Sequence, residues 1–219
     1  MELLRFLFFS SLEYIPMIIF MFAIFRFSFR SIIPQTVFIC LLMSLFSHTV
    51  RNTEIAQYAA VLQLILFIVC IWLLYRVHWF YSMVMGVIGY QSYITFQAFF
   101  IVMFTYSGLA SIEELHYGSI KGIILLICSV GVPLLISYFL HRSAWGFTFV
   151  PTGNSIKVKL AGFNLVIFLL SLLSIVIIGA LNYFYVSNMI SSFFVLSLIQ
   201  LVILTSMIYY SIKKERLEI

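Results

Sequence analysis

The stretch Ser10-Ser11-Leu12-Glu13-Tyr14-Ile15-Pro16 stands inside the first long apolar run of the chain, from Phe6 to Phe25. About 20 apolar residues in a helix cross the roughly 30 Å hydrocarbon core of a bilayer, so this run predicts a membrane-spanning helix. Within it, Glu13 is ionisable and Pro16 frees a backbone carbonyl, and both features require polar partners nearby. Ionisable groups at this depth cost about 2 to 3 kcal/mol on insertion scales and usually serve a function. Glu13 is therefore our leading candidate for a functional residue.

The composition of all 219 residues is typical of a membrane protein. Hydrophobic residues make up 64% and charged residues 9%, whereas about 25% of the residues in a soluble domain are charged. The formal charge of +5 then indicates basic residues retained in the cytoplasm and not nucleic-acid binding. The first run is too long for a signal peptide and lacks a small-residue cleavage site, so we expect an uncleaved span.

Seven apolar runs are long enough to cross a lipid bilayer. They lie at about 5–25, 32–50, 55–75, 79–106, 120–141, 160–186 and 189–212. The second run is the weakest, because Pro34, Gln35 and His48 dilute it. The sequence thus predicts an all-α polytopic bundle in which residues 1–219 form a single transmembrane domain.

The distribution of lysine and arginine orients this bundle. If the C-terminus is cytoplasmic, nine of the 12 basic residues flank the spans on the inner side. The outer side then has only Arg5, Arg51 and Lys121. Short connections with such a bias follow the positive-inside rule. We therefore expect the N-terminus outside, the C-terminus inside, and a place in the cell membrane.

Two of the connections between spans contain patterns that suggest a structure or a site. The external one contains Glu113, Glu114 and His116, which form an incomplete metal-ligand set, and a solvated loop is the simpler interpretation. The internal one has two β-favouring runs around Pro151-Thr152-Gly153-Asn154, which predicts a small cytoplasmic hairpin at 146–160.

Polar side chains on three other spans lie at a depth comparable to that of Glu13. Gln63 is in the outer half of the third span, Gln91 and Thr95 share one face of the fourth, and Gln200 is near the middle of the seventh. One interpretation is that all five line a polar cavity open to the outside, which binds a small cationic or hydrogen-bonding ligand, or a proton. The alternative is that these groups hold helices together, at about 0.6 kcal/mol per contact.

Motifs of catalysis are missing from the sequence. It has no HExxH, no GxSxG, no P-loop and no Cys/His nucleophile pair. The three cysteines, Cys40, Cys70 and Cys128, lie in separate apolar runs, which disfavours disulfides and zinc binding. We therefore expect no enzyme, no catalytic residues, no cofactor and no metal site.

Two segments carry a family resemblance. The run Leu4-Arg5-Phe6-Leu7-Phe8-Phe9-Ser10-Ser11-Leu12-Glu13, followed by Phe25-Arg26-Phe27, resembles the start of the multi-span sensor regions of Gram-positive sensor histidine kinases with a GHKL-type ATPase domain. The segment Trp145-Gly146-Phe147-Thr148-Phe149-Val150-Pro151 is similar to part of those regions. The resemblance implies ligand sensing in the bilayer and homo-oligomerisation. The phosphoacceptor region and nucleotide motifs of the kinases are missing here, so the output would come from a cytoplasmic output domain or a partner kinase.

The resulting hypothesis is a sensor or receptor-like module. It binds a small molecule or peptide from the outer side and passes a rearrangement down the last span, whose charged end from Lys213 to Glu218 predicts a helix leaving the membrane. The alternative is a membrane transport component, either a small permease or a subunit of a larger transporter. A third possibility treats all the polar residues as packing in a structural protein.

Overall fold

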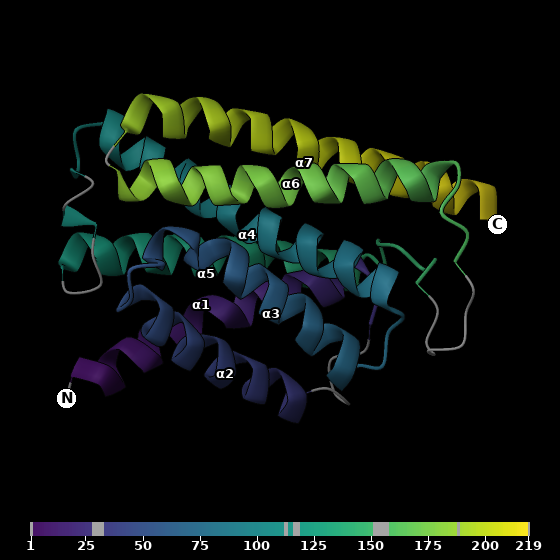
Figure 1. The fold of residues 1–219 in the computed structure, drawn as a ribbon, viewed down its shortest axis with the longest axis horizontal. Helices are drawn as coiled ribbons and strands as arrows, with labels where there is room; N and C mark the ends of the chain where they lie inside the picture. The colour runs from purple at the N-terminus through teal and green to yellow at the C-terminus, as the bar shows by residue number, and fades with distance from the viewer. Residues whose placement is uncertain are drawn as a thin grey trace.

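The computed structural model describes residues 2–27, 33–111, 114–115, 119–150, 158–187 and 189–218. They form an elongated bundle of long helices, with the N-terminus at one end and the C-terminus at the other (Figure 1). The helices are α1 (Glu2–Ile24), α2 (Ile33–Arg51), α3 (Ala59–Leu74), α4 (Trp79–Tyr106), α5 (Ile120–Arg142), α6 (Phe163–Val186) and α7 (Ile190–Glu218), with a short 3-10 helix, η1 (Ala56–Tyr58), before α3.

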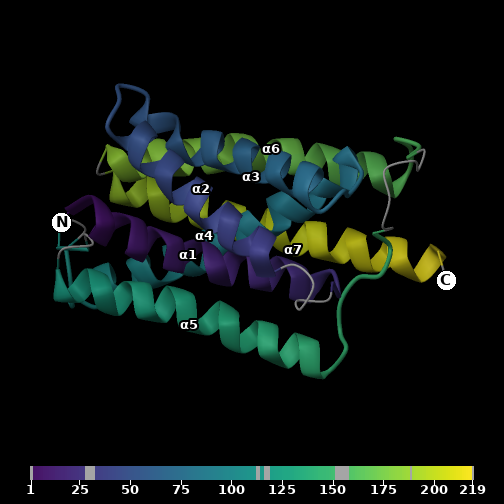
Figure 2. The ribbon, with the colours of Figure 1, turned by 90° about the horizontal axis from the view of Figure 1, so that it is seen from below.

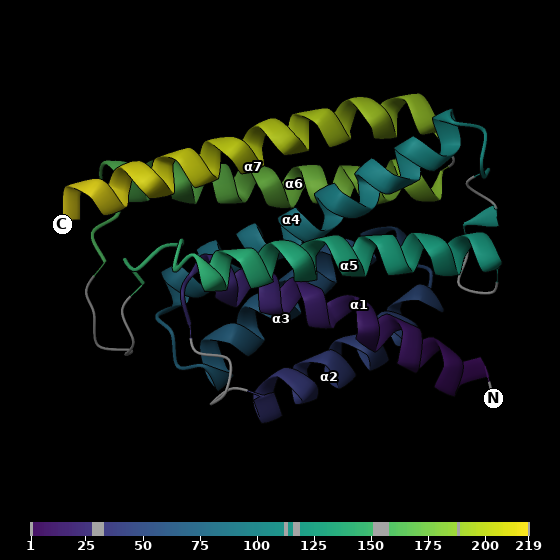
Figure 3. The ribbon, with the colours of Figure 1, turned by 180° about the vertical axis from the view of Figure 1, so that it is seen from behind.

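Seven helices of the described ranges are long and apolar enough to cross a bilayer, which makes the chain a multi-pass membrane protein. Successive helices run in opposite directions along the long axis (Figures 1 and 3). The all-α prediction is confirmed, and the predicted spans agree with the observed helices to within a few residues at most ends. The exception is α7, which continues to Glu218, past the predicted end at 212.

The central helix is α4, which contacts α1, α3, α5, α6 and α7. Every residue from Phe80 to Tyr93 is buried, as expected for a helix surrounded by others. Two glycines allow other helices to approach α4 closely. A Cβ atom on Gly89 would lie 2.8 Å from the Met21 Cβ on α1, and one on Gly86 would lie 2.8 Å from the Ile68 Cγ1 on α3.

The other helices surround α4. In the view of Figure 2, α5 lies along one side of the bundle and α3 and α6 along the other, while α1 and α2 cross between them. Pro16 lies inside α1 without ending it. The alternating directions bring the starts of α1, α3, α5 and α7 and the ends of α2, α4 and α6 to one end, here called the N-terminal end. The other end, where α7 finishes, is the C-terminal end.

The predicted hairpin at 146–160 is not confirmed. Its turn, 151–157, lies outside the described residues, and the described flanks, 146–150 and 158–160, contain no strand. The backbone of the first flank bonds to α1 instead, since the Phe147 N–H donates to the Ile24 carbonyl oxygen at 2.6 Å. The side chains of Phe147 and Phe149 are buried. Docking of these aromatic residues on the bundle therefore replaces the expected pairing of two strands.

Candidate ligand-binding cavity

A cavity of about 290 Å³ lies toward the N-terminal end of the bundle, and all seven helices contribute to its walls. It has room for about ten water molecules, at the small end of the range for ligand pockets. Its lining reaches the end of the bundle, since it includes Arg51, the last residue of α2, and Ala59, the first of α3. The fully buried lining residues include Met17 on α1 and Ile178 on α6.

One wall of the cavity is polar and carries Glu13. This carboxylate is 9% exposed, and Gln97 Nε2 on α4 donates to its Oε1 at 3.5 Å. Tyrosine rings from three helices line the cavity around it, namely Tyr14, Tyr90, Tyr93 and Tyr185. The remaining surface is largely aliphatic. Such a site combines an apolar body with a few convergent polar groups, as ligand pockets commonly do.

Gln63 lines the same cavity but is engaged by its neighbours. Its Oε1 accepts hydrogen bonds from the hydroxyls of Tyr14 at 3.2 Å and Tyr90 at 3.3 Å. Its Nε2 donates to the Ser47 hydroxyl at 3.0 Å. These bonds join α1, α2, α3 and α4 beside the cavity. Gln63 therefore fixes the positions of two of the tyrosines in the wall, Tyr14 and Tyr90.

Gln91, Thr95 and Gln200 do not line the cavity. Gln91 Nε2 donates to the Gln200 carbonyl oxygen at 2.9 Å, and its Oε1 accepts from the Ser174 hydroxyl at 3.0 Å. Thr95 donates only within its own helix, to the Gln91 carbonyl oxygen at 2.8 Å. Gln200 is fully buried. These contacts form a separate layer that joins α4 to α6 and α7.

The five residues expected to line one cavity thus form two separate groups. The reason is the helical period of α4. Its cavity face follows Tyr90, Tyr93, Ile94 and Gln97, so Gln91 is turned about 100° away. Ligand contact by any of the five residues stays a prediction. Glu13 and Gln63 are at the cavity, and the other three are in the adjoining layer.

Arg51 is one of the site residues that the sequence did not reveal. In the sequence it stands out only as one of the three basic residues on the outer side. In the structure the side chains of Arg51 and Glu13 line the same cavity. The available signal was topological, because the end of the second span and the outer half of the first span were both placed on the outer side.

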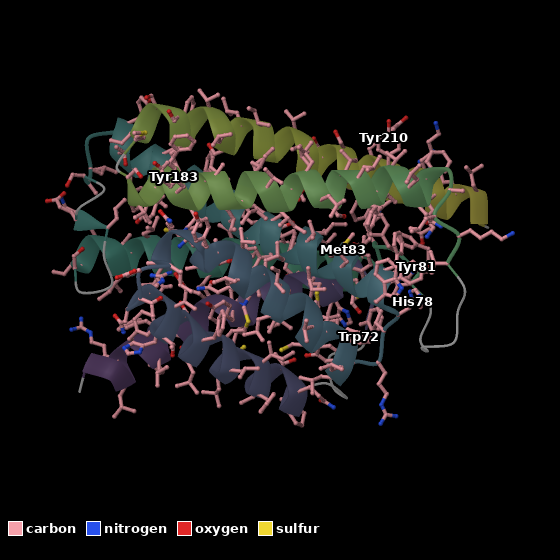
Figure 4. All side chains as sticks on the ribbon, in the orientation of Figure 1. Trp72, His78, Tyr81, Met83, Tyr183 and Tyr210 are labelled. Carbon is pink, nitrogen blue, oxygen red and sulfur yellow. The ribbon has the colours of Figure 1, made fainter. Side chains whose placement is uncertain are left out.

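A second cluster lies at the C-terminal end, where Lys214 of α7 is only 3% exposed. Its Nζ lies 4.8 Å from the centroid of the Tyr81 ring and 4.4 Å from that of Phe149, and 3.4 Å from the Tyr81 hydroxyl. Figure 4 shows Tyr81 at this end of α4, close to the connection after α5. A desolvated cation between aromatic rings contributes about 2 kcal/mol.

The neighbouring residue fastens α7 to the same connection. Glu215 Oε1 accepts from the Thr148 backbone N–H at 2.8 Å and from its hydroxyl at 2.6 Å. We call this group the C-terminal junction and define it as Ile24, Tyr81, residues 147–149, Lys214 and Glu215. It links the end of α7 to the end of α1 and the start of α4.

The predicted acidic loop is only partly described. Glu113 and His116 lie outside the described residues. The Glu114 carboxylate forms an ion pair with Lys121 at 2.8 Å and accepts from the Ser111 N–H at 3.0 Å. The Lys121 ammonium lowers the pKa of the Glu114 carboxyl below its usual range. Among the residues that the structure describes, no group of three potential metal ligands is found.

No family model, curated protein or solved structure matches the chain. The candidate site therefore rests on its own geometry.

Proposed function

We propose that this multi-pass membrane protein is a receptor-like sensor without enzymatic activity. A small molecule or short peptide enters from the outer side, occupies the cavity and shifts the packing of α7. The observation that carries the proposal is the cavity of about 290 Å³ whose walls include Glu13 of α1 and Phe193 of α7. A ligand there contacts the helix that would transmit the change.

The route from the cavity to α7 passes through α4. Tyr90 and Tyr93 face the cavity, while Gln91 between them holds Ser174 of α6 and the backbone of Gln200 on α7. A ligand that favours one arrangement of the tyrosines therefore favours one position of Gln91. The shift in population equals the difference in its affinity for the two packings.

The proposed orientation places the cavity outside and the C-terminal junction inside the cell. The nine-to-three distribution of basic residues supports it. The junction, with α7 protruding beside it, is then the surface for an output domain or a partner kinase, and homo-oligomerisation would bring two such surfaces together. This arrangement is the one implied by the resemblance to kinase sensor regions.

The second candidate is a membrane transport component. A carboxylate lining a cavity at membrane depth favours it, because such residues also mark substrate pathways. The C-terminal junction favours the sensor, since buried aromatic rings and Lys214 fill that end near α1, α4 and α7. Solute flux in proteoliposomes containing only this chain would favour transport, and binding without flux would favour sensing.

A tethered occupant tests the sensor without knowledge of the ligand. In a background with Cys40, Cys70 and Cys128 replaced by alanine, Ile94→Cys places a thiol on the cavity wall. Reaction of this thiol with a small uncharged methanethiosulfonate then attaches a group that occupies the cavity. We expect faster hydrogen–deuterium exchange of the Thr148 amide, which Glu215 holds in the described state.

The matched control is Phe99→Cys on the same helix, because Phe99 is 61% exposed on the outer surface of the bundle. Its modification should leave exchange at Thr148 unchanged. Equal exchange before and after modification of Ile94→Cys, with complete labelling shown by mass spectrometry, would contradict signalling through α7.

A further inference from the structure

Several hydrogen-bond donors of the cavity wall are already used within the protein. The hydroxyls of Tyr14 and Tyr90 both donate to Gln63 Oε1, at 3.2 and 3.3 Å. Gln63 Nε2 donates to the hydroxyl of Ser47, which does not line the cavity, at 3.0 Å. A hydroxyl has one hydrogen and two lone pairs. The phenol oxygens of Tyr14 and Tyr90 are therefore acceptors for an occupant of the cavity.

The other two amides of the lining use their donors in the same way. Asn182 Nδ2 on α6 donates to the carbonyl oxygens of Gln57 at 2.7 Å and Ala56 at 3.4 Å, and neither residue lines the cavity. Gln97 Nε2 donates to Glu13 Oε1 at 3.5 Å. The carboxamide oxygens and the Glu13 carboxylate can only accept. A carboxylate has sites for about four hydrogen bonds, so Glu13 can accept from an occupant in addition to its protein neighbours.

The acceptors of α1 and α4 lie close together. Because Tyr14 and Tyr90 share one acceptor atom on Gln63, their phenol oxygens are within about 6.5 Å of each other. Glu13 is next to Tyr14 in α1, and Gln97 lies about two turns after Tyr90 on the cavity face of α4. The bond between Gln97 and Glu13 joins the two sets. This part of the wall, between α1 and α4, thus presents one acceptor surface.

Aromatic rings line the same cavity. Tyr93 of α4, Tyr185 of α6 and Phe193 of α7 accompany Tyr14 and Tyr90. The ring centroids of Tyr185 and Phe193 are 5.7 Å apart, with the ring planes at 50°. The face of an aromatic ring carries partial negative charge and attracts cations, and cages of such rings bind ammonium groups. The rings and the acceptors therefore favour the same kind of occupant.

We propose that the cavity binds a small organic amine in its ammonium form. A primary ammonium group has three donors and no acceptor, which matches a lining whose polar groups mainly accept. It lies beside the phenol oxygens of Tyr14 and Tyr90 and the carboxylate of Glu13. The apolar body packs against Ile94 and Leu125. A volume of about 290 Å³ holds roughly ten non-hydrogen atoms when each is given the volume of a water molecule.

The biological meaning of this site rests on the proposed sensor function, whereas binding is measured separately. Three probes of similar size separate charge from shape. Phenethylamine is a cation at neutral pH, phenethyl alcohol is uncharged and phenylacetate is an anion. Calorimetric titration of the full chain in lipid nanodiscs, corrected with empty nanodiscs, should give a Kd for the amine at least tenfold lower than for the other two probes. One charge-assisted hydrogen bond corresponds to about tenfold to hundredfold in affinity.

Glu13→Gln tests the contribution of the carboxylate. This variant keeps an acceptor oxygen and nearly the same shape, and removal of a charge from membrane depth should not hinder insertion. We expect the Kd of phenethylamine to rise at least tenfold and that of phenethyl alcohol to stay the same. Arg5→Gln is the matched control, because Arg5 is an outer-side charge that does not line the cavity. It should keep the full preference for the amine.

Arg51→Gln distinguishes a cation from an anion as the occupant. Arg51 lines the cavity from the exposed end of α2, and its charge opposes a cation and attracts an anion. The variant should therefore bind phenethylamine at least as tightly as the wild-type chain. A loss of amine affinity in this variant would contradict the proposed site.

Three results with the wild-type chain would overturn the proposal. Equal binding of phenethyl alcohol and phenethylamine would show that the cavity does not select a charge. Tighter binding of phenylacetate, lost in Arg51→Gln, would indicate an anion site. Binding of none of the probes would exclude a small aromatic amine. In each case the sensor function is still judged by the occupant tethered at Ile94→Cys, whose effect on the Thr148 amide requires no ligand.

Discussion

Gln91 is the residue at which the cavity wall and the last two helices meet. It lies between Tyr90 and Tyr93 on α4 but is turned away from the cavity, with both ends of its amide bonded to other helices. A fully buried amide with both ends engaged fixes the relative position of the helices it joins. Thr95, one turn along α4, makes only an intrahelical bond.

Replacing Gln91 by leucine should lower the free energy of unfolding by about 1 kcal/mol, because two interhelical hydrogen bonds of about 0.6 kcal/mol each are lost. Titration of the purified chain with sodium dodecyl sulfate in mixed micelles measures the change. Thr95→Val is the control and should change stability by only a few tenths of a kcal/mol. Similar losses in both variants would show that Gln91 does not join the helices.

The sequence predicted part of the site at this scale. Glu13 and Gln63 were recognised because polar residues in apolar runs are costly. The sequence did not mark the other polar residues of the wall, namely Arg51, Gln97 and the tyrosines. A tyrosine or a terminal arginine is common in membrane proteins and does not stand out. To assign them to one cavity, one must know which face each helix turns toward it. The nearly uniform hydrophobicity around α4 does not reveal that face.

Among the elements, the connection after α5 departs most from expectation. Its β-favouring residues bury their rings against α1 and α4, because the aromatic side chains gain more there than a two-stranded hairpin would provide. Gly146 makes the close approach possible. Its φ is +148°, and a Cβ atom there would lie 2.5 Å from the Ile24 carbonyl oxygen.

Gly146→Ala should therefore destabilise the protein by about 1 to 3 kcal/mol, through backbone strain and displacement of the Ile24 carbonyl. Thermal unfolding in detergent measures it. Gly131→Ala in α5 is the comparison, because nothing lies within 4 Å of the added methyl group. That change should be neutral or stabilise by up to about 1 kcal/mol. A tolerated Gly146→Ala would mean that the connection does not dock on α1.

The connection between α4 and α5 has a measurable pH dependence. The Lys121 ammonium lowers the pKa of the Glu114 carboxyl, so the pair stabilises this connection above the ordinary carboxyl pKa and the effect is lost as the pH falls through the lowered value. We expect Lys121→Gln to raise the pKa toward its usual range. Carbon-13 NMR titration of the Glu114 carboxyl in micelles measures it.

Lys159→Gln serves as the control for that titration, since Lys159 belongs to the connection at the opposite end of the bundle. It should leave the Glu114 pKa unchanged. An unaltered pKa in Lys121→Gln would show that the ion pair does not form in solution.

For the whole molecule, the number of helices and most of their ends were predictable. The bilayer demands runs of about 20 apolar residues, and the connections of this chain are short and polar enough to separate them. The order of packing was not predictable. In a membrane, helix association depends on close packing and small residues instead of water exclusion, so the central position of α4 depends on details such as Gly86 and Gly89.

Single cysteines in the cysteine-free background test the orientation. Ser107 and Ser143 are both exposed and lie at opposite ends of the bundle. A membrane-impermeant maleimide added to intact cells should label Ser107→Cys and label Ser143→Cys only after lysis. The reverse pattern would place the cavity on the cytoplasmic side and contradict the proposed topology.

The burial of Lys214 restricts how α7 can move. Lys214 is held between two rings, and Glu215, about 100° further around the helix, holds Thr148. Spinning of α7 about its own axis therefore breaks one attachment or the other, whereas sliding or tilting together with the connection keeps both. While both attachments hold, the exposed Lys213 and Arg216 keep a constant direction relative to the bundle. Release of Thr148 from Glu215 removes one of the two restraints, so α7 could then turn and present a different edge to a partner at this end.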